Sequence, residues 1–440
     1  MKKQKFITFG FALTALTGAL LLTPPLLAED AAITDEASVQ TSRLQSLAKF
    51  TKVLGLVEKY NVDPVTIEEL MDKALSGMLS NLDAHSTFLN EKHFESMKIQ
   101  TDGEFGGLGI TVGIKDGALT VIAPIEGTPA DKAGLKAGDI ILKINDKSTL
   151  SMTIDDAVSI MRGKKGTPIN LTIVRKNEPK PLSIDIVRDI IKIQSVYAKN
   201  IGTDILYLRV TSFDKKVVDG VKKELQKPAN KDKSIILDLR NNPGGLLDQA
   251  VGLVDLFVAE GVIVSQKGRD LEEEKTYSAT SAGTYLQQPI VVLVNEGSAS
   301  ASEIVSGALQ DHKRAVIVGD NTFGKGSVQV ILPITETEAI KLTIARYYLP
   351  SGRTIQAVGV KPDVEVHLGE VKTYENEFSI KEADLKKHLE GELAKVNGDK
   401  PKKDEPKKDK NLITPEDLNK DLQLKEAVGI AKALQIMKGH

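Results

Sequence analysis

The feature that most constrains the fold is a repeated order of buried strand, glycine-rich turn and helix in the second half of the chain. Residues 234–239 and 290–294 are short, almost uncharged runs rich in β-branched residues, which is typical of strands buried on both faces. Glycines follow each run, and apolar residues at helical spacing continue over 246–257 and 299–309. This alternation predicts an α/β layer with crossover connections.

Residues 103–190 follow a different pattern, in which short strands are separated by glycine turns. The expected strands lie at 109–112, 119–122, 140–144, 169–174 and 182–187, and a short helix is expected at 154–161. These lengths predict a compact mixed domain of about ninety residues.

Helices are predicted on either side of these regions. Residues 41–57 and 67–79 place apolar side chains on one helical face, and residues 415–437 are expected to form one closing amphipathic helix. The N-terminal helices either cover a core or pair with a partner chain, and periodicity does not distinguish these alternatives. Residues 400–410 are charged and broken by proline, so they are expected to form a solvated linker.

The first thirty residues resemble an export signal. Three lysines precede an apolar run over 6–22, and Ala28 precedes two acidic residues. No later segment is long and apolar enough to span a bilayer. The mature chain is therefore expected to be periplasmic or otherwise exported, with an uncleaved anchor in the inner membrane as the alternative.

Composition excludes several classes of function. Lys and Arg number 58 against 60 Asp and Glu, so the net charge of -2 lacks the basic excess typical of proteins that bind nucleic acid. The absence of cysteine excludes disulfides, thiolate zinc sites and a cysteine nucleophile. The six histidines lack the spacing of a metal site, and neither a metal nor another cofactor is expected.

Three serines, Ser298, Ser300 and Ser302, lie where a buried strand is expected to turn into a helix. A helix N-terminus has unpaired N–H groups and a partial positive charge. A serine there can attack a substrate while the next N–H stabilises the developing oxyanion. Serine is also a favoured N-cap residue, so this segment alone is equally consistent with simple capping.

A serine nucleophile needs a base. His312 is expected at the far end of the following helix, so it is interpreted as a surface or helix-end residue. Lys325 is the remaining candidate, because burial can lower the pKa of a lysine towards neutrality. Strand character after Lys325 would place Lys325, Ser327 and Gln329 on one face, where Gln329 can orient the amine. A solvated loop lysine is the alternative.

The lysine segment also fits part of a phosphate-binding loop. Residues 319–325 have the pattern GxxxxGK, but such a loop continues with Ser or Thr and then a helix. Gly326 occupies the next position and a strand is expected after it. A nucleotide site is therefore not expected.

These segments resemble the carboxyl-terminal processing proteases, which are serine endopeptidases with a Ser-Lys dyad and an embedded PDZ domain. Residues 297–304 are similar to the nucleophile motif of this family, 323–329 to its lysine motif and 238–245 to its oxyanion loop. The family separates nucleophile and lysine by 25 positions, which selects Ser300 together with Lys325.

The resemblance extends over residues 60–363 and implies the architecture. It implies an α/β multidomain protein, with a crotonase-like α/β protease core, an inserted PDZ domain and flanking helices. The expected divisions are a signal peptide or anchor at 1–28, a helical region at 29–102, the PDZ domain at 103–190, the protease core at 191–370, and a C-terminal region with the Lys-rich linker and closing helix at 371–440.

The same resemblance implies a role for each residue of the site. Ser300 is the nucleophile, Lys325 takes its proton and Gln329 positions Lys325. The oxyanion hole is expected from the N–H groups of Ala301 and of Gly244 or Gly245.

Residues 107–110 look like the PDZ loop that turns N–H groups towards the terminal carboxylate of a peptide, while the peptide adds a strand to the sheet edge. The peptide-binding residues implied by this likeness are Gly107, Leu108, Gly109 and Ile110. Arg162 is implied as a relay from the bound peptide to the protease, although an arginine at a helix end is also ordinary dipole complementation.

Two hypotheses of function follow. The first is an exported serine endopeptidase whose PDZ domain captures proteins or peptides with exposed, apolar C-termini and whose dyad cleaves them, with an activating adaptor as a further partner. The second is a PDZ-based peptide-binding scaffold without catalysis. Loss of catalysis would normally replace Ser300 or Lys325, and both are present. No nucleic-acid partner is expected, and the flanking helices favour a homo-oligomer.

Overall fold

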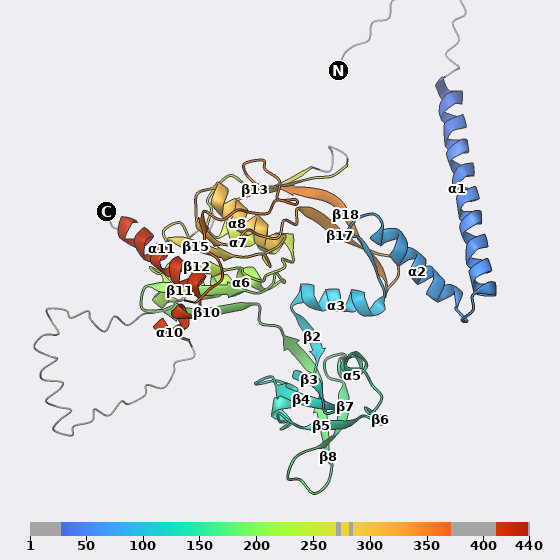
Figure 1. Ribbon diagram of the computed structural model, residues 1–440, viewed down its shortest axis with the longest axis horizontal. Coiled ribbons are helices and arrows are strands. Elements are labelled where there is room, and N and C mark those ends of the chain that lie inside the picture. The colour runs from blue at the N-terminus through green and yellow to red at the C-terminus, as the bar shows by residue number, and fades with distance from the viewer. Residues whose placement is uncertain (1–27, 270–273, 281–284, 371–410, 439–440) are drawn as a thin grey trace, which may run out of the picture. The chain divides into compact units, whose positions relative to one another are not determined.

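The computed structural model describes residues 28–269, 274–280, 285–370 and 411–438 (Figure 1). The predicted signal or anchor segment, apart from its last residue, and the predicted linker at 400–410 lie outside this part. The chain forms two compact units that divide between Met78 and Leu79, and each is described by itself.

The first unit consists of helices. α1 (Ala28–Tyr60) and α2 (Ile67–Ser80) contain the two predicted N-terminal helices, and α1 begins well before the expected position. Several large apolar side chains of α1 are exposed, namely Leu44, Leu47, Phe50, Val53, Leu56 and Tyr60. No helix in the described ranges is both long and apolar enough to cross a membrane.

The second unit is built on a six-stranded sheet in the order β10-β11-β12-β15-β16-β19. Its strands are β10 (Val196–Ile201), β11 (Ile205–Val210), β12 (Ser234–Asp238), β15 (Ile290–Val294), β16 (Val316–Gly319) and β19 (Val364–Glu365). β10 pairs antiparallel with β11, and the other neighbours are parallel. The predicted α/β layer with crossover connections is therefore confirmed.

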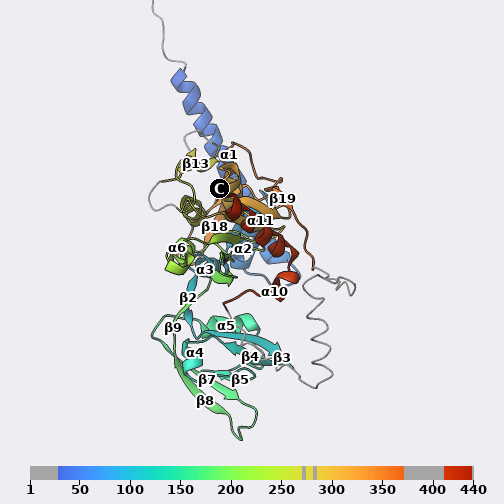
Figure 2. The ribbon, with the colours of Figure 1, turned by 90° about the vertical axis from the view of Figure 1, so that its left-hand side faces the viewer.

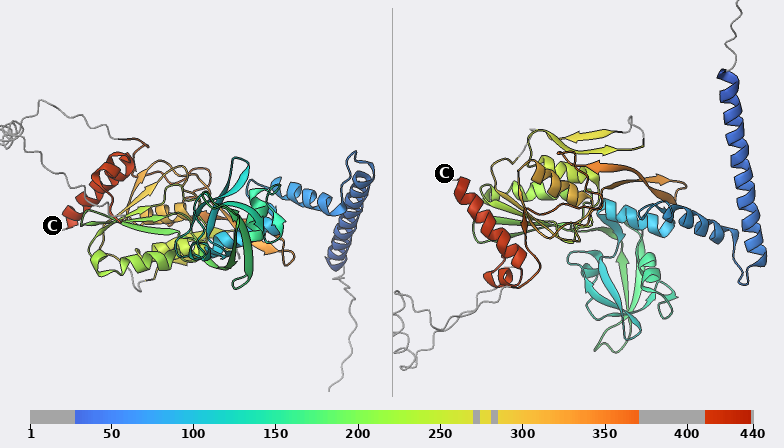
Figure 3. Two further views of the ribbon diagram at one scale, coloured as in Figure 1. Left: turned by 90° about the horizontal axis from the view of Figure 1, so that it is seen from below. Right: turned by 45° about the horizontal axis from the view of Figure 1, so that its top comes forward.

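Helices cover both faces of this sheet, which is why its central strands are apolar on both sides. α6 (Val217–Leu225), α7 (Leu247–Asp255) and α8 (Ala301–Asp311) share one core with the strands. α11 (Leu422–Lys438) packs on the opposite face (Figure 3). Burial of an aliphatic side chain such as Leu424 or Val428 contributes about 1.5–3 kcal/mol.

The closing region departs from the prediction. One helix was expected over 415–437, but α10 (Pro415–Asn419) and α11 are separate, so that prediction is wrong. Asp421 lies at the break, where its carboxylate accepts the Leu424 N–H at 3.0 Å. Aspartate is a favoured N-cap residue, and this local bond begins a second helix instead of continuing the first.

A second sheet lies beside the first and carries the lysine segment at its edge. It has the order β1-β18-β13-β14, and β17 also pairs with β18. Its strands are β1 (Thr87–Leu89), β13 (Val262–Lys267), β14 (Lys275–Ser278), β17 (Ser327–Pro333) and β18 (Ala339–Tyr348). α3 (Glu91–Asp102) follows β1 and leads into the inserted domain.

The inserted domain has a sheet in the order β3-β4-β5-β7-β8 (Figure 2). β6 pairs with β5, and the domain has its own apolar core. Its elements are β3 (Ile110–Lys115), β4 (Ala118–Pro124), α4 (Pro129–Lys132), β5 (Ile140–Ile144), β6 (Lys147–Ser148), α5 (Ile154–Met161), β7 (Pro168–Val174) and β8 (Leu182–Val187). The five strands and the helix predicted here are confirmed. The chain enters through β2 (Glu104–Gly107) and leaves through β9 (Asp189–Lys192), and these two strands pair antiparallel.

Candidate active site

Ser300 lies in the turn between β15 and α8, in a conformation that serine rarely adopts. Its φ is 55° and its ψ is −110°, and the residue is 8% exposed. Residues held in sparsely populated backbone regions cost about 1–3 kcal/mol and persist only where the surroundings fix them. Here the Ser300 N–H donates to the Glu303 carboxylate at 2.8 Å, and the Ser300 carbonyl accepts the Ile304 N–H at 2.9 Å.

The two neighbouring serines have structural roles. The Ser298 hydroxyl donates to the Leu239 carbonyl at 2.8 Å, and the Ser302 hydroxyl donates to the Asn242 carbonyl at 2.9 Å. Both residues are fully buried. Of the three serines that the sequence left open, Ser298 and Ser302 therefore hold the turn against residues 238–245, and Ser300 remains the candidate nucleophile.

Glu303 connects the serine turn to the lysine segment. It is fully buried, and its Oε1 accepts the Thr322 hydroxyl and the Gly324 N–H, each at 2.6 Å. Its Oε2 accepts the backbone N–H groups of Lys325 and Ser300, each at 2.8 Å. One carboxylate oxygen therefore binds the backbones of both predicted catalytic residues, and the structure brings the two together although they are 25 positions apart.

The surroundings of Lys325 shift its amine towards the neutral form. Burial lowers the pKa of Lys325, the nearby charge of Lys341 lowers it further, and the Glu303 carboxylate opposes the shift. Among the described residues, no hydrogen bond joins the Lys325 amine to Ser300 or Gln329. Catalytic hydrogen bonds are often long without substrate and tighten in the reactive complex.

Gln329 is oriented by its own sheet. Its Nε2 donates to the Ser327 hydroxyl at 2.8 Å and to the Thr343 hydroxyl at 3.3 Å. Ser327 and Gln329 thus share a face of β17, as alternation predicted, but Lys325 precedes the strand, so the prediction that it lies on the same strand face is wrong. The Thr343 hydroxyl in turn donates to Asp83 at 3.2 Å, which fixes the amide nitrogen on the side of β18.

The turn after β12 lies directly against the serine. A Cβ on Gly244 would be 2.9 Å from the Ser300 Cβ, and a Cβ on Gly245 would be 2.3 Å from the Phe213 carbonyl oxygen. Their φ angles are 99° and 148°, so glycine is required at both positions. The Gly244 N–H donates to the Asn242 side chain at 2.9 Å, whereas no acceptor for the N–H of Gly245 or Ala301 occurs among the described residues.

The loop at 107–110 presents its backbone. Leu108 is 2% exposed and belongs to the core of the inserted domain, so its side chain is not part of the surface. The carbonyls of Leu108 and Gly109 accept the N–H groups of Ala130 and Ile125 at 2.9 and 2.8 Å. Arg162 ends α5 with its guanidinium 5.3 Å from the Phe105 ring, and its buried Nε has no partner in the described part of the chain.

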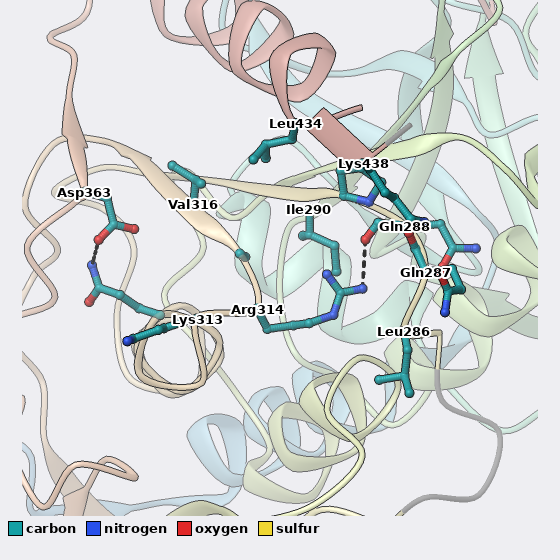
Figure 4. Close-up of a pocket in the computed structure, with 13 residues that line it drawn as sticks. Leu286, Gln287, Gln288, Ile290, Lys313, Arg314, Val316, Asp363, Leu434 and Lys438 are labelled. Atoms are coloured by element: carbon teal, nitrogen blue, oxygen red, sulfur yellow. Dashed lines mark hydrogen bonds between the residues drawn. The ribbon is translucent and has the colours of Figure 1, made fainter. Parts of the chain in front are cut away.

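The far end of α8 is not part of this site. His312 ends the helix, as expected, and its Nε2 lies 2.7 Å from the Val262 carbonyl oxygen. A cavity of about 450 Å³ lies at this end of α8, where Ile290 begins β15 and Arg314 donates to the Gln288 carbonyl at 2.8 Å (Figure 4). Ser300 lies at the opposite ends of β15 and α8. No cluster of metal-ligating side chains occurs in the described ranges.

Glu303 is the functional residue that sequence reasoning missed. Its signal was the presence of Glu three residues after a serine that precedes a helix, which is the capping-box pattern. That pattern predicts the hydrogen bond that the Ser300 N–H donates to the Glu303 carboxylate. It does not predict that the same carboxylate also binds the backbone around Lys325.

Comparisons with known proteins identify the family of the chain. Peptidase family S41 matches residues 204–366, and the PDZ domain family matches residues 120–175. The carboxy-terminal-processing protease of Bartonella bacilliformis is 42% identical over 389 residues, covering 87% of each chain. The carboxy-terminal processing protease CtpA of Bacillus subtilis is 33% identical over 376 residues, covering 84% of this chain and 78% of the relative.

Among solved structures, the photosystem II D1 C-terminal processing protease is 26% identical, with 72% of this chain and 92% of that chain covered and a TM-score of 0.42. The family assignment rests on the sequence relatives, which match along most of their own length. The chain belongs to peptidase family S41, the carboxy-terminal-processing proteases, and is a serine-type hydrolase that carries a PDZ domain.

Proposed function

We propose that this protein is an exported endopeptidase that cleaves by a Ser-Lys dyad of Ser300 and Lys325 and recognises protein C-termini through its PDZ domain. The observation that carries the proposal is the Glu303 Oε2 atom, which accepts the backbone N–H groups of both residues at 2.8 Å. A structural lysine would not need its backbone fixed to that of a strained serine.

The proposed reaction proceeds in two steps. Ser300 Oγ attacks the carbonyl carbon of the scissile bond while the neutral Lys325 amine takes the hydroxyl proton. The N–H groups of Ala301 and Gly245 stabilise the oxyanion, and the Lys325 ammonium returns the proton to the departing amine. Water then attacks the acyl ester with Lys325 again as base, which releases the acid and restores the serine.

Gln329 supports the base in this scheme. Its amide nitrogen is held by Ser327 and Thr343, so its Oε1 is left to accept from the Lys325 amine. A fixed acceptor limits the directions in which the amine can point, which favours the one that faces the serine.

The PDZ domain offers a place for a peptide to bind. β3 is the edge strand of its sheet and directly follows the loop at 107–110. An extended peptide can add a strand beside β3 while the loop N–H groups receive its terminal carboxylate. Ile110 and the apolar core of the domain favour an apolar last residue.

This mode of recognition predicts that a peptide with a free, apolar C-terminal residue binds about ten- to a hundredfold more tightly than its amidated twin, because only the former offers a carboxylate to the loop. Isothermal titration calorimetry with the Ser300→Ala protein measures both affinities without cleavage. Equal affinities would contradict recognition of the C-terminus.

Binding can tether a substrate or switch the enzyme on, and a contact path favours the second. A Cβ on Gly103 would lie 2.6 Å from Asp214, and the neighbouring Phe213 N–H donates to the Gly244 carbonyl at 2.9 Å. Arg162 is the proposed relay on the PDZ side. If binding switches the enzyme on, a non-cleavable peptide should speed hydrolysis of a short substrate that cannot reach both the PDZ domain and the serine. If binding only tethers the substrate, the same peptide should compete with a long substrate and slow its hydrolysis.

The exposed apolar residues of α1 favour a homo-oligomer formed through this helix, and an activating adaptor is proposed as a further partner. The alternative function, a scaffold without catalysis, is tested by a fluorophosphonate probe and by digestion of unstructured proteins with different C-termini. Labelling of Ser300 together with cleavage supports the enzyme. Intact substrates and an unlabelled serine would support the scaffold.

A further inference from the structure

We infer that the first turn of α11 positions both catalytic loops, through the side chains of Asp421 and Gln423. The inference rests on the proposed Ser300–Lys325 dyad. Asp421 and Gln423 are more than ninety positions from either residue in the sequence, and they contact no reacting atom. They act through Arg240 on the turn at 241–245 and through Asp320 on the loop that holds Lys325.

Arg240 is the first point of contact. Its Nη1 and Nη2 donate to the two Asp421 carboxylate oxygens at 2.8 Å each, and Nη1 also donates to Gln423 Oε1 at 3.1 Å. Its Nε and Nη2 donate to the fully buried Asp238 at 3.0 and 2.7 Å. All five N–H donors of the guanidinium are therefore satisfied, which fixes its plane.

The charge of this cluster is stable. Burial lowers the pKa of Arg240, but the hydrogen bonds that it donates to Asp238 and Asp421 outweigh this effect and hold that pKa above its ordinary value. Burial raises the pKa of Asp421, but the bond from Arg240 outweighs it and lowers that pKa. The guanidinium and carboxylate thus remain charged at neutral pH.

Arg240 is also the first residue of the turn that reaches the nucleophile. The next residue, Asn241, has a φ of 56°, and its N–H donates to Asn295 at 2.8 Å. The carbonyl of Asn242 accepts the Ala299 N–H at 3.0 Å, and Gly244 then lies against Ser300. Asn241 and Asn242 thus connect Arg240 to the serine turn by hydrogen bonds, so displacement of Arg240 is expected to displace the proposed oxyanion hole.

Gln423 provides the second connection. It is fully buried, and its Nε2 donates to Asp320 Oδ2 and to the Val366 carbonyl, each at 2.8 Å. Asp320 follows β16 and begins the loop in which the Thr322 hydroxyl binds Glu303 and Lys325 follows. The side chain of Gln423 therefore connects the Arg240 guanidinium, which precedes the turn at 241–245, to the Asp320 carboxylate, which begins the loop of Lys325.

Stability does not explain this arrangement. A buried ion pair gains little over well-packed apolar residues, because its desolvation is costly. α11 is held on the sheet by apolar side chains, including Leu424, Ala427, Val428 and Ala431. Because the helix breaks at Asp421, this one carboxylate both caps α11 and binds Arg240. A positioning role requires such a double contact.

Asp421→Asn tests the first connection, with Asp417→Asn as its matched control. The control makes the same chemical change on α10, where the carboxylate accepts the Thr414 N–H at 2.9 Å. The hydrogen bonds of Arg240 go instead to Asp238, Asp421 and Gln423. Asp421→Asn is expected to lower kcat about ten- to a hundredfold with KM nearly unchanged, because misplaced oxyanion donors weaken only transition-state binding. Asp421→Glu, which keeps the charge, should recover part of kcat.

Gln423→Met tests the second connection. It removes the two bonds that Nε2 donates to Asp320 and Val366, and the one that Oε1 accepts from Arg240, without adding charge. The lysine loop is then loosened and water reaches the amine. The burial that lowers the pKa of Lys325 is then reduced, so the midpoint of the rise of kcat/KM with pH should move to higher pH. The charged or titratable groups that face Lys325 are Glu303, Lys341 and His85, and none of them is altered.

All assays are run below the melting transition of each variant, as followed by circular dichroism. The inference would be overturned if Asp421→Asn had the same kcat as Asp417→Asn, or if the pH midpoint of Gln423→Met did not move. The proposed function would still stand in that case, provided that the wild-type protein cleaves and Ser300→Ala does not. Absence of cleavage by the wild-type protein would overturn the proposed function, and the inference with it.

Discussion

Replacing Ser300 with alanine is expected to lower peptide cleavage by about 10⁵- to 10⁶-fold, because removal of a serine nucleophile leaves only binding and oxyanion stabilisation. The fold should persist, since the side chain loses one oxygen and the backbone N–H keeps its bond to Glu303. Cleavage of an unstructured protein, followed by mass spectrometry, measures the loss. The melting temperature measures the fold.

Ser298→Ala and Ser302→Ala are the controls. Each removes a hydroxyl that donates to the backbone of residues 238–245, so each should cost about 0.5–1.5 kcal/mol of stability and retain measurable activity. A Ser300→Ala protein that cleaves at the wild-type rate would exclude Ser300 as nucleophile. Loss of activity only in one of the two controls would transfer that role.

Lys325→Arg is expected to lower kcat/KM between about 10²- and 10⁴-fold, because arginine stays protonated and cannot take the serine proton. The wild-type enzyme should gain activity as pH rises through the Lys325 pKa and then reach a plateau. Burial lowers that pKa, so the midpoint should lie below the ordinary lysine value of about 10.4. Initial rates across a pH series test both statements.

A control variant checks the sign of this pH dependence. The positive charge of Lys341 lowers the pKa of Lys325, so Lys341→Met should raise that pKa and move the midpoint to higher pH. Near-normal turnover by Lys325→Arg, with an unchanged pH profile, would be incompatible with a lysine base.

The sequence was sufficient for features that depend on neighbouring residues. Buried strands such as Ile290–Val294 are uncharged on both faces, so their position follows from composition alone. The turn at Gly244 and Gly245 could also be predicted from neighbouring residues, because these glycines adopt φ angles that other residues avoid. Ser300 and Lys325 were selected by motif spacing, and the shared contact with Glu303 shows why that spacing is possible.

Features that depend on contacts between distant parts of the chain could not be predicted from the sequence. β18 pairs with β1, β13 and β17, three segments that lie far apart in the chain or across a turn, and no local pattern identifies these partners. The amide nitrogen of Gln329 binds Thr343 on β18, which strand alternation cannot reveal. The break before α11 likewise arises because Asp421 binds both its own helix and Arg240.

The paired strands β2 and β9 make the PDZ domain an exchangeable module. The chain leaves the protease core at Glu104 and returns at Lys192, and these two residues are directly opposite each other in the ribbon. Insertions whose ends lie side by side add a domain without separating the elements of the host. Evolution or an engineer can therefore replace the PDZ domain by another domain joined through the same pair of strands, while the rest of the chain keeps its own core.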